Sequence, residues 1–159
     1  MAVWQYSFFI VPKLEVENKY GQIPLAIDSE FHDEFVGWQG VSVDQVETIL
    51  AKNFGNLSPT GYGPLVFGRE DGSCVSLLFN GCILENVTVR LDLRQTVADQ
   101  IKDAIKLCEL LDGILVTSDN RTIPCHDEDL IASIKDSSAV KFVKNPQDFF
   151  ASLESNKKA

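Results

Sequence analysis

The stretch that decides the fold is Ser73–Arg94, which reads Ser-Cys-Val-Ser-Leu-Leu-Phe-Asn-Gly-Cys-Ile-Leu-Glu-Asn-Val-Thr-Val-Arg-Leu-Asp-Leu-Arg. Two runs of strand-forming residues flank Asn80-Gly81. An Asn-Gly pair in this setting is typical of a two-residue type I′ turn, because both central residues of that turn need positive φ. The stretch therefore predicts an antiparallel hairpin in which Phe79 lies opposite Cys82.

The second run of the hairpin alternates between apolar and polar residues. Its two faces carry Val87, Val89, Leu91 and Leu93 on one side and Thr88, Arg90, Asp92 and Arg94 on the other. Such a strand has one face in a core and one face toward water or a partner. A regular register would place Glu85 among the apolar residues, and Leu77 and Phe79 among the polar ones. A β-bulge near Glu85 or Asn86 removes these mismatches, because one extra residue exchanges the faces; the alternative is that both faces are covered near the turn.

Further strands are predicted on either side of this hairpin, from runs of β-branched and aromatic residues. Their ranges are 3–11, which Pro12 closes, then 65–67, 114–117 and 122–123. Residues 13–27 are polar, contain Gly21 and Pro24, and predict a loop. Residues 28–35 predict a short helix at most, and residues 37–40 a turn or short strand.

The predicted helices begin at residues whose side chains accept a backbone N–H. These starts are Ser42, which forms a capping box with Gln45, and then Thr96, Asp127 and Asn145. The first helix covers 43–53. The helix over 97–112 has the broadest apolar stripe, which is typical of a helix packed on a sheet, and Gly113 is expected to end it.

The order of these elements predicts the fold class. Strands come early, in a central run and after a long helix, which is typical of an α+β domain. We expect a single domain over residues 1–154, with a mostly antiparallel β-sheet around the central hairpin and helices packed on one face. Residues 155–159 are expected to fray. A doubly wound parallel sheet would need regular strand–helix alternation, which the hairpin interrupts.

Composition narrows the classes of partner. The chain has 159 residues, 45% of them hydrophobic, and a net charge of −9. That charge argues against nucleic acid and anionic membrane surfaces, and it permits a basic protein partner. The four cysteines show no metal-site spacing and are expected to be free thiols. With no secretory signal and no long apolar run, the sequence predicts a cytoplasmic protein.

Two sequence clusters invite a catalytic or metal-binding interpretation, and a structural one is favoured for each. Cys125-His126-Asp127-Glu128 already reads as a helix start, and neighbours in sequence tend to diverge in space. His32 lies among acids that are typical of a solvated face, and metal affinity needs convergent ligands. The glycines between Gly55 and Gly63 lack the spacing of a phosphate-binding loop. No catalytic residue, metal or cofactor is therefore predicted.

Two sets of residues are candidates for binding a partner. Trp38, between two glycines, is either a core residue or an exposed anchor, and the acids Glu30 and Glu34 precede it. The second set lies on the polar face of the hairpin's second strand and consists of Arg90, Asp92 and Arg94. It is either a solvated row of ion pairs or the wall of a groove that receives a carboxylate.

Motifs along the chain resemble those of a scattered group of uncharacterised small bacterial proteins. They are Trp4-x-Tyr6-x-Phe8-x-x-Val11-Pro12-Lys13, Trp38-x-Gly40, Val89–Arg94, and Lys141-Phe142-Val143 with Pro146 and Phe150. Some members of that group are encoded beside polymorphic toxins, as immunity proteins are. The resemblance implies a bacterial cytoplasmic protein that binds and blocks a toxin domain, and it supplies no catalytic residue.

The expected function is therefore a non-enzymatic protein-binding domain, of the immunity type, with a basic protein partner. One alternative is an enzyme or a binder of a small molecule or anion, with a pocket between sheet and helices and Arg90 and Arg94 holding the anion. The other is a structural or assembly subunit. A deep pocket with two convergent titratable groups would favour the enzyme.

Overall fold

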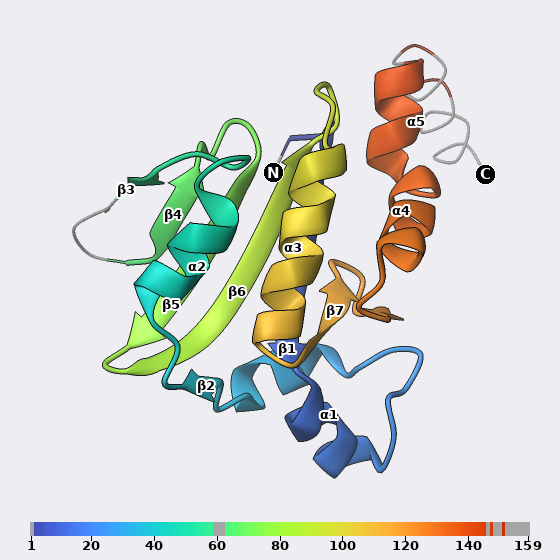
Figure 1. Ribbon diagram of the computed structural model, residues 1–159. Helices are drawn as coiled ribbons and strands as arrows, with labels where there is room; N and C mark the ends of the chain where they lie inside the picture. The colour runs from blue at the N-terminus through green and yellow to red at the C-terminus, as the bar shows by residue number, and fades with distance from the viewer. Residues whose placement is uncertain (1, 59–62, 146, 148–150, 152–159) are drawn as a thin grey trace.

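The computed structural model describes residues 2–58, 63–145, 147 and 151 and shows one open sheet with helices layered on it (Figure 1). The strands are β1 (Gln5–Pro12), β2 (Trp38–Gln39), β3 (Leu57–Ser58), β4 (Leu65–Gly68), β5 (Cys74–Asn80), β6 (Ile83–Asp92), β7 (Gly113–Thr117) and β8 (Thr122–Ile123). They lie in the order β3-β4-β5-β6-β1-β7-β8, and β2 pairs with β6. Every pairing among the described strands is antiparallel.

The central hairpin is confirmed, with its turn one residue later than the sequence suggested. Asn80 pairs with Ile83, so the two-residue loop is Gly81-Cys82 instead of Asn80-Gly81. Of these residues only Gly81 has a positive φ, at 61°, which matches a type II′ turn better than type I′. The expected bulge is present, because the register shifts between Leu78 and Phe79 opposite Glu85. The shift puts Leu77 and Val87 on the same buried face.

The main core lies between one face of the sheet and the helices that follow β2 in the chain. These are α2 (Val43–Leu50), α3 (Ala98–Leu110) and α4 (Asp127–Lys135), followed by α5 (Ser138–Lys144). In Figure 1, α2 and α3 lie in front of the sheet, and α4 and α5 lie at its right-hand side. The residues predicted to be buried here are buried, namely Val87, Val89, Leu91, Ile101, Ile105 and Cys108. The sheet contributes Phe8, Ile10, Phe67 and Leu115 to the same cluster.

A second, smaller core lies on the opposite face of the sheet, at the end where β1 meets β7. The prediction of a loop over residues 13–27 is wrong there, because Lys13–Tyr20 form the helix α1. Gly21 ends α1 in the left-handed conformation, with φ 75°. The short helix predicted within 28–35 is the 3-10 helix η1 (Ser29–Glu34). This core consists of Val11, Val16, Ile27, Phe31, Ile114 and Val116.

Several helix ends differ from the sequence prediction. The capping box is confirmed, since Ser42 Oγ accepts from Gln45 N at 3.2 Å and Gln45 Oε1 accepts from Ser42 N at 3.3 Å. By contrast, α3 has Val97 at its N-cap and no side-chain cap, so Thr96 does not cap it. Asp112, with φ 46°, adopts the left-handed conformation that was expected of Gly113.

Two further corrections concern the last helices. His126 occupies the N-cap of α4, and Asp127 is its first residue. The helix α5 was not predicted; its N-cap Ser137 accepts from Val140 N at 3.3 Å, and Asn145 ends it. Apart from residues 147 and 151, the helix predicted to follow Asn145 lies outside the described residues, and so does the tail 155–159 that was expected to fray.

The fold class is confirmed as α+β, with a mostly antiparallel sheet in a single compact domain. Gly113 leaves room for β1 beside the start of β7. A Cβ on Gly113 would come within 2.7 Å of Ile10 Cγ2 and 3.0 Å of the Val11 carbonyl oxygen.

Among the described helices, none is both long and apolar enough to cross a bilayer.

Candidate functional site

Trp38 is half-buried and fixed to the main core. Its backbone pairs with Leu84 in β6, and its indole Nε1 donates to the Leu111 carbonyl oxygen at 2.7 Å. The ring packs against the buried cluster. The polar group of the indole is therefore used inside the protein, where it joins β2 to the end of α3.

The acids that precede Trp38 lie on η1 and are exposed. Glu34 accepts from Lys19 Nζ of α1 at 2.9 Å, and that lysine also lies 4.2 Å above the ring of Phe31. Glu30 is exposed near the start of η1. The ion pair holds η1 against α1, so one of the two acids has a structural partner.

The second candidate set does not form the expected row. Asp92 is buried and receives two hydrogen bonds from Arg94, Nε to Oδ1 at 2.9 Å and Nη2 to Oδ2 at 2.7 Å. Arg94 lies beyond β6 and stacks on Trp4, with Cζ 4.3 Å from the ring centroid. Arg90 instead donates to the Glu70 carbonyl oxygen at 3.2 Å. The bonds from Arg94 hold the pKa of the Asp92 carboxyl below its usual value.

The two candidate sets lie at opposite ends of β6. Trp38 pairs near the first residues of that strand, and Asp92 is its last residue. The distance from Leu84 to Asp92 is roughly 26 Å along the strand, at about 3.3 Å per residue. The structure therefore does not bring them into one site.

The helix α1, the strand β2 and the last turn of α3 lie at the bottom of Figure 1, and exposed apolar residues belong to these elements and the segments next to them. We call this region the α1 end and define it by Leu14, Leu25, Val36 and Leu110, which are 63%, 92%, 64% and 43% exposed. Backbone contacts hold the segments together. Lys13 N donates to the Asp112 carbonyl oxygen at 3.2 Å, and Val36 N donates to Glu15 Oε1 at 2.8 Å.

A groove of about 680 Å³ opens at the α1 end, and we call it the α3 groove. Its apolar wall is formed by Ile23, Pro24, Leu25, Ile114, Ile123 and Pro124. Lys13, Glu109, Asp112, Cys125 and His126 supply its polar groups. The volume lies within the range of small-molecule and side-chain pockets. The sequence did not point to this groove, because its wall comes from segments 13–25, 109–114 and 122–126.

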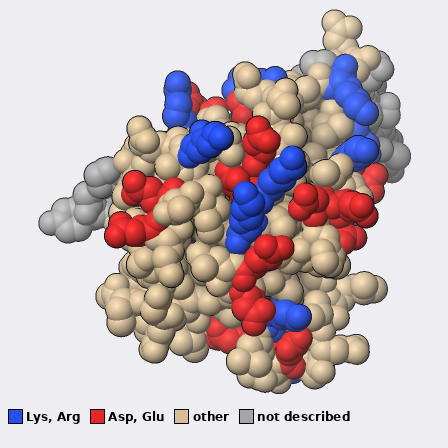
Figure 2. All heavy atoms as spheres, in the orientation of Figure 1, with Lys and Arg blue, Asp and Glu red and all other residues tan. Residues whose placement is uncertain are grey.

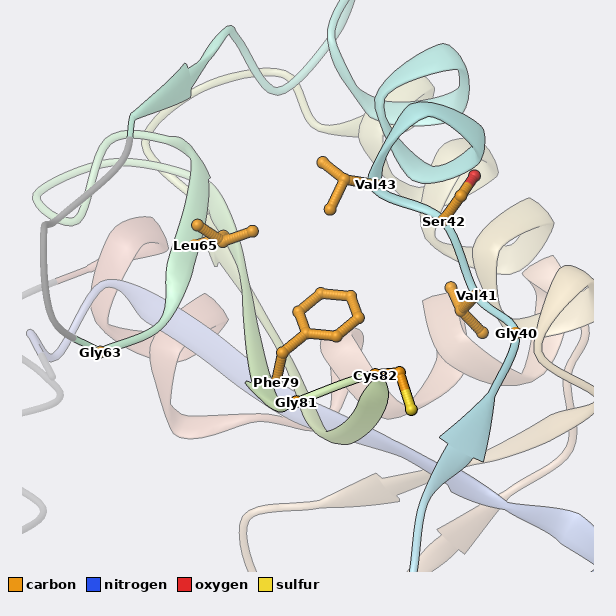
Figure 3. A pocket seen from close by; sticks show the side chains of 9 residues that line it. All are labelled: Gly40, Val41, Ser42, Val43, Gly63, Leu65, Phe79, Gly81 and Cys82. Atoms are coloured by element: carbon orange, nitrogen blue, oxygen red, sulfur yellow. The ribbon is translucent and has the colours of Figure 1, made fainter.

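A second cavity, of about 570 Å³, lies between the tip of the β5–β6 hairpin and the start of α2. Figure 3 shows the Phe79 ring pointing into it, with Val43 and Leu65 across from the ring. Val41 and Cys82 complete its near side. We call it the hairpin cavity. It lies between the sheet and a helix, as the small-molecule alternative expects.

Neither titratable cluster of the sequence forms a catalytic arrangement. His32 Nε2 hydrogen-bonds Asn120 Oδ1 at 2.9 Å, and its ring lies 5.0 Å from that of Phe9. Cys125 directs its thiol to the Ile105 carbonyl oxygen at 3.6 Å, and His126 is exposed at the N-cap of α4. Among residues 2–58, 63–145, 147 and 151, no three His, Cys, Asp or Glu residues converge in a way that would hold a metal ion.

Charges on the helical face are mixed. Figure 2 shows Lys and Arg side chains along the middle of this face, over α3, with Asp and Glu side chains on both sides. The exposed lysines of α3 are Lys102 and Lys106. The excess of acids in the whole chain is therefore not concentrated in one patch on this face.

Comparison with known proteins gives no match to a family model, to a curated protein or to a solved structure.

Proposed function

We propose that this chain is a non-enzymatic protein-binding domain of the immunity type, which docks a basic toxin domain on its α1 end. The observation that carries the proposal is Leu25, a large apolar side chain that is 92% exposed beside a mostly apolar groove. Soluble monomers seldom expose clustered apolar side chains, and such surfaces are typical of interaction sites.

The apolar residues of the α1 end suit the centre of an interface. Leu14, Leu25 and Val36 belong to three different segments and are each more than half exposed. Their segments are joined by hydrogen bonds, such as that from Gly37 N to Glu15 Oε2 at 3.2 Å, so the surface needs little reorganisation on binding. Trp38 contributes rigidity at the edge of this surface, since its indole is held by Leu111.

Acidic side chains around this centre favour a basic partner. Glu109 and Asp112 border the α3 groove, and Glu30 and Glu34 lie on η1. Together with the net charge of −9, they are expected to steer a positively charged protein during the encounter. Binding energy would then come from the desolvated apolar residues, and the acids would mainly affect the association rate.

The test compares two exposed leucines. The binding partner is a purified toxin domain encoded immediately upstream of this chain's gene, and affinity is measured by calorimetry. Leu25→Asp should weaken binding by about 2 kcal/mol or more, roughly 30-fold, as at an interface hot spot. Leu78→Asp is the matched control, because Leu78 is 39% exposed on β5 and does not line the α3 groove. Its affinity should match that of the unmodified chain.

Charge variants complete this test. Glu30→Gln combined with Glu34→Gln should slow association, and the difference should fade as the salt concentration rises. Equal losses of affinity for Leu25→Asp and Leu78→Asp would contradict the proposed surface. If every variant bound the toxin domain as tightly as the unmodified chain, the toxin domain would still be a partner. The α1 end would then be excluded as its binding surface.

The hairpin cavity supports one alternative, the binding of a small apolar molecule. Phe79 is half-buried and points into a cavity whose lining includes the aliphatic side chains of Val41, Val43 and Leu65. Protein binding at the α1 end and small-molecule binding in the hairpin cavity are distinguished by the substitution that abolishes binding. A small apolar ligand in this cavity would be lost with Phe79→Ala and retained with Leu25→Asp.

A further inference from the structure

Two cysteines from different elements lie against each other beneath the α3 groove. Cys108 is buried on α3, and Cys125 is half-buried in the turn between β8 and α4. The Cys125 thiol contacts the Ile105 carbonyl oxygen at 3.6 Å. Ile105 precedes Cys108 by three residues, so both lie on the same face of α3, and the Cys125 thiol lies against that face.

The two thiols differ in access. Cys125 borders both the α3 groove and a neighbouring recess lined by Ile105, Glu109 and His126. Cys108 is fully covered and lies behind it. A small reagent that enters the groove therefore meets the Cys125 sulfur first.

We propose that Cys125 and Cys108 are an oxidisable dithiol, in which Cys125 reacts first with a peroxide and Cys108 then closes a disulfide. The inference does not depend on a protein partner. It gives the groove a modification site, because the disulfide would tie α3 to the turn that precedes α4.

The reaction balances in two steps. The Cys125 thiolate attacks one oxygen of hydrogen peroxide, the O–O bond breaks, and a sulfenic acid and hydroxide form. The Cys108 sulfur then attacks the Cys125 sulfur, the S–O bond breaks, and the hydroxyl leaves as water with the Cys108 proton. Two thiols and one peroxide thus give one disulfide and two waters, and the sulfurs lose two electrons to the peroxide.

Burial raises the pKa of both thiols, so little thiolate forms at neutral pH and both steps are slow. The second step needs no further reagent, because Cys108 lies on the face of α3 that the Cys125 thiol contacts. The exposed Cys82, at the tip of the hairpin, offers a comparison, since Cys74 lies at the other end of β5 and cannot reach it.

The experiment treats the folded protein with hydrogen peroxide, blocks free thiols with N-ethylmaleimide, and maps unreduced peptides by mass spectrometry. The expected product joins Cys108 to Cys125 and loses two hydrogens, while Cys74 remains blocked by maleimide. Cys125→Ser should abolish the cross-link. Cys108→Ser should leave a Cys125 sulfenic acid that dimedone traps, and if that variant does not fold, Cys125→Ser alone carries the test.

Oxidation of the unfolded chain is the control for geometry. In urea, a shorter loop closes more readily, so Cys74 and Cys82 should pair in preference to Cys108 and Cys125. A switch from one pair to the other between the folded and unfolded protein supports the proposal. A dimedone-labelled Cys125 in the folded unmodified protein without a cross-link would overturn it, as would the same pairing pattern in both states.

Discussion

The carboxylate of Asp92 has a structural role in the fold and is not available to bind a partner. Strand alternation predicted it on a polar face between two arginines, but it is buried, and its oxygens accept from Arg94 at 2.9 and 2.7 Å. Oδ1 also accepts from the backbone N of Arg94 at 3.1 Å. The residue therefore closes the turn after β6, and its contribution to stability should depend on pH.

The pKa of Asp92 is lower in the folded protein than its ordinary value of 3.8. The stability it supplies is present above the unfolded pKa and is lost as pH falls through the folded pKa. Asp92→Asn should therefore lower the melting temperature at neutral pH, and the difference from the unmodified protein should shrink toward about pH 2.

Asp71→Asn is the control for this pH dependence. Asp71 also pairs with an arginine, Arg69, at 2.7 Å, but both side chains are more than two-thirds exposed. Solvent screening makes such pairs weak. Thermal melts across the acid range should show a small, nearly constant effect for Asp71→Asn, and a similar curve for Asp92→Asn would contradict the argument.

At the scale of elements, α3 and α2 are joined by a polar contact inside the main core. Asp103 is buried on α3, and its Oδ2 accepts from Asn53 Nδ2 at 2.7 Å. Gln100, one turn earlier, donates to the Asn53 carbonyl oxygen at 2.9 Å. These bonds fix the segment after α2 against the face of α3.

Removing the buried partner should cost more than removing an exposed neighbour. Asp103→Ala leaves the Asn53 amide without its acceptor and should lower the free energy of unfolding by about 1–3 kcal/mol. Lys102→Ala, on the exposed side of α3, should change it by at most about 0.5 kcal/mol. Urea titration measures both, and equal effects would show that the contact contributes nothing specific.

The elements also show where sequence patterns are sufficient. The hairpin and α3 were predicted because their apolar periodicity follows the burial they have in the fold. The helix α1 was missed because its apolar stripe is narrow, with Val16 its only buried residue. A local signal was present, since Lys13 and Glu17 lie four residues apart and Gly21 follows the last turn.

The candidate sites were harder to predict than the elements. The pairing of Trp38 with β6 and the positions of Glu109 and Leu25 beside one groove depend on contacts between segments far apart in sequence. Local patterns do not carry that information. They identified residues whose side chains could bind a partner or react, but the tertiary structure places these residues apart.

The described residues form two cores of unequal size on the two faces of one sheet. The smaller one depends on α1 and η1, each of which buries a single side chain, so it should open locally at lower free energy than the main core. Native-state hydrogen exchange should therefore be faster in α1 than in α3 and β6.

Two core substitutions test this hierarchy. Val16→Ala should speed exchange in α1 and leave that of α3 nearly unchanged. Leu107→Ala, in the main core, should lower global stability by about 2–5 kcal/mol and speed exchange of the slowest amides. If Val16→Ala accelerated exchange equally everywhere, the two cores would form one cooperative unit.

The position of β1 between β6 and β7 has a consequence for biosynthesis. The ribosome makes β1 first, but its two neighbours comprise residues 83–92 and 113–117. During translation, Phe8 and Ile10 therefore wait without their strand partners until most of the domain has been made, which leaves them available to chaperones. Release of β7 from the ribosome exit tunnel is the event that allows the sheet to close around β1.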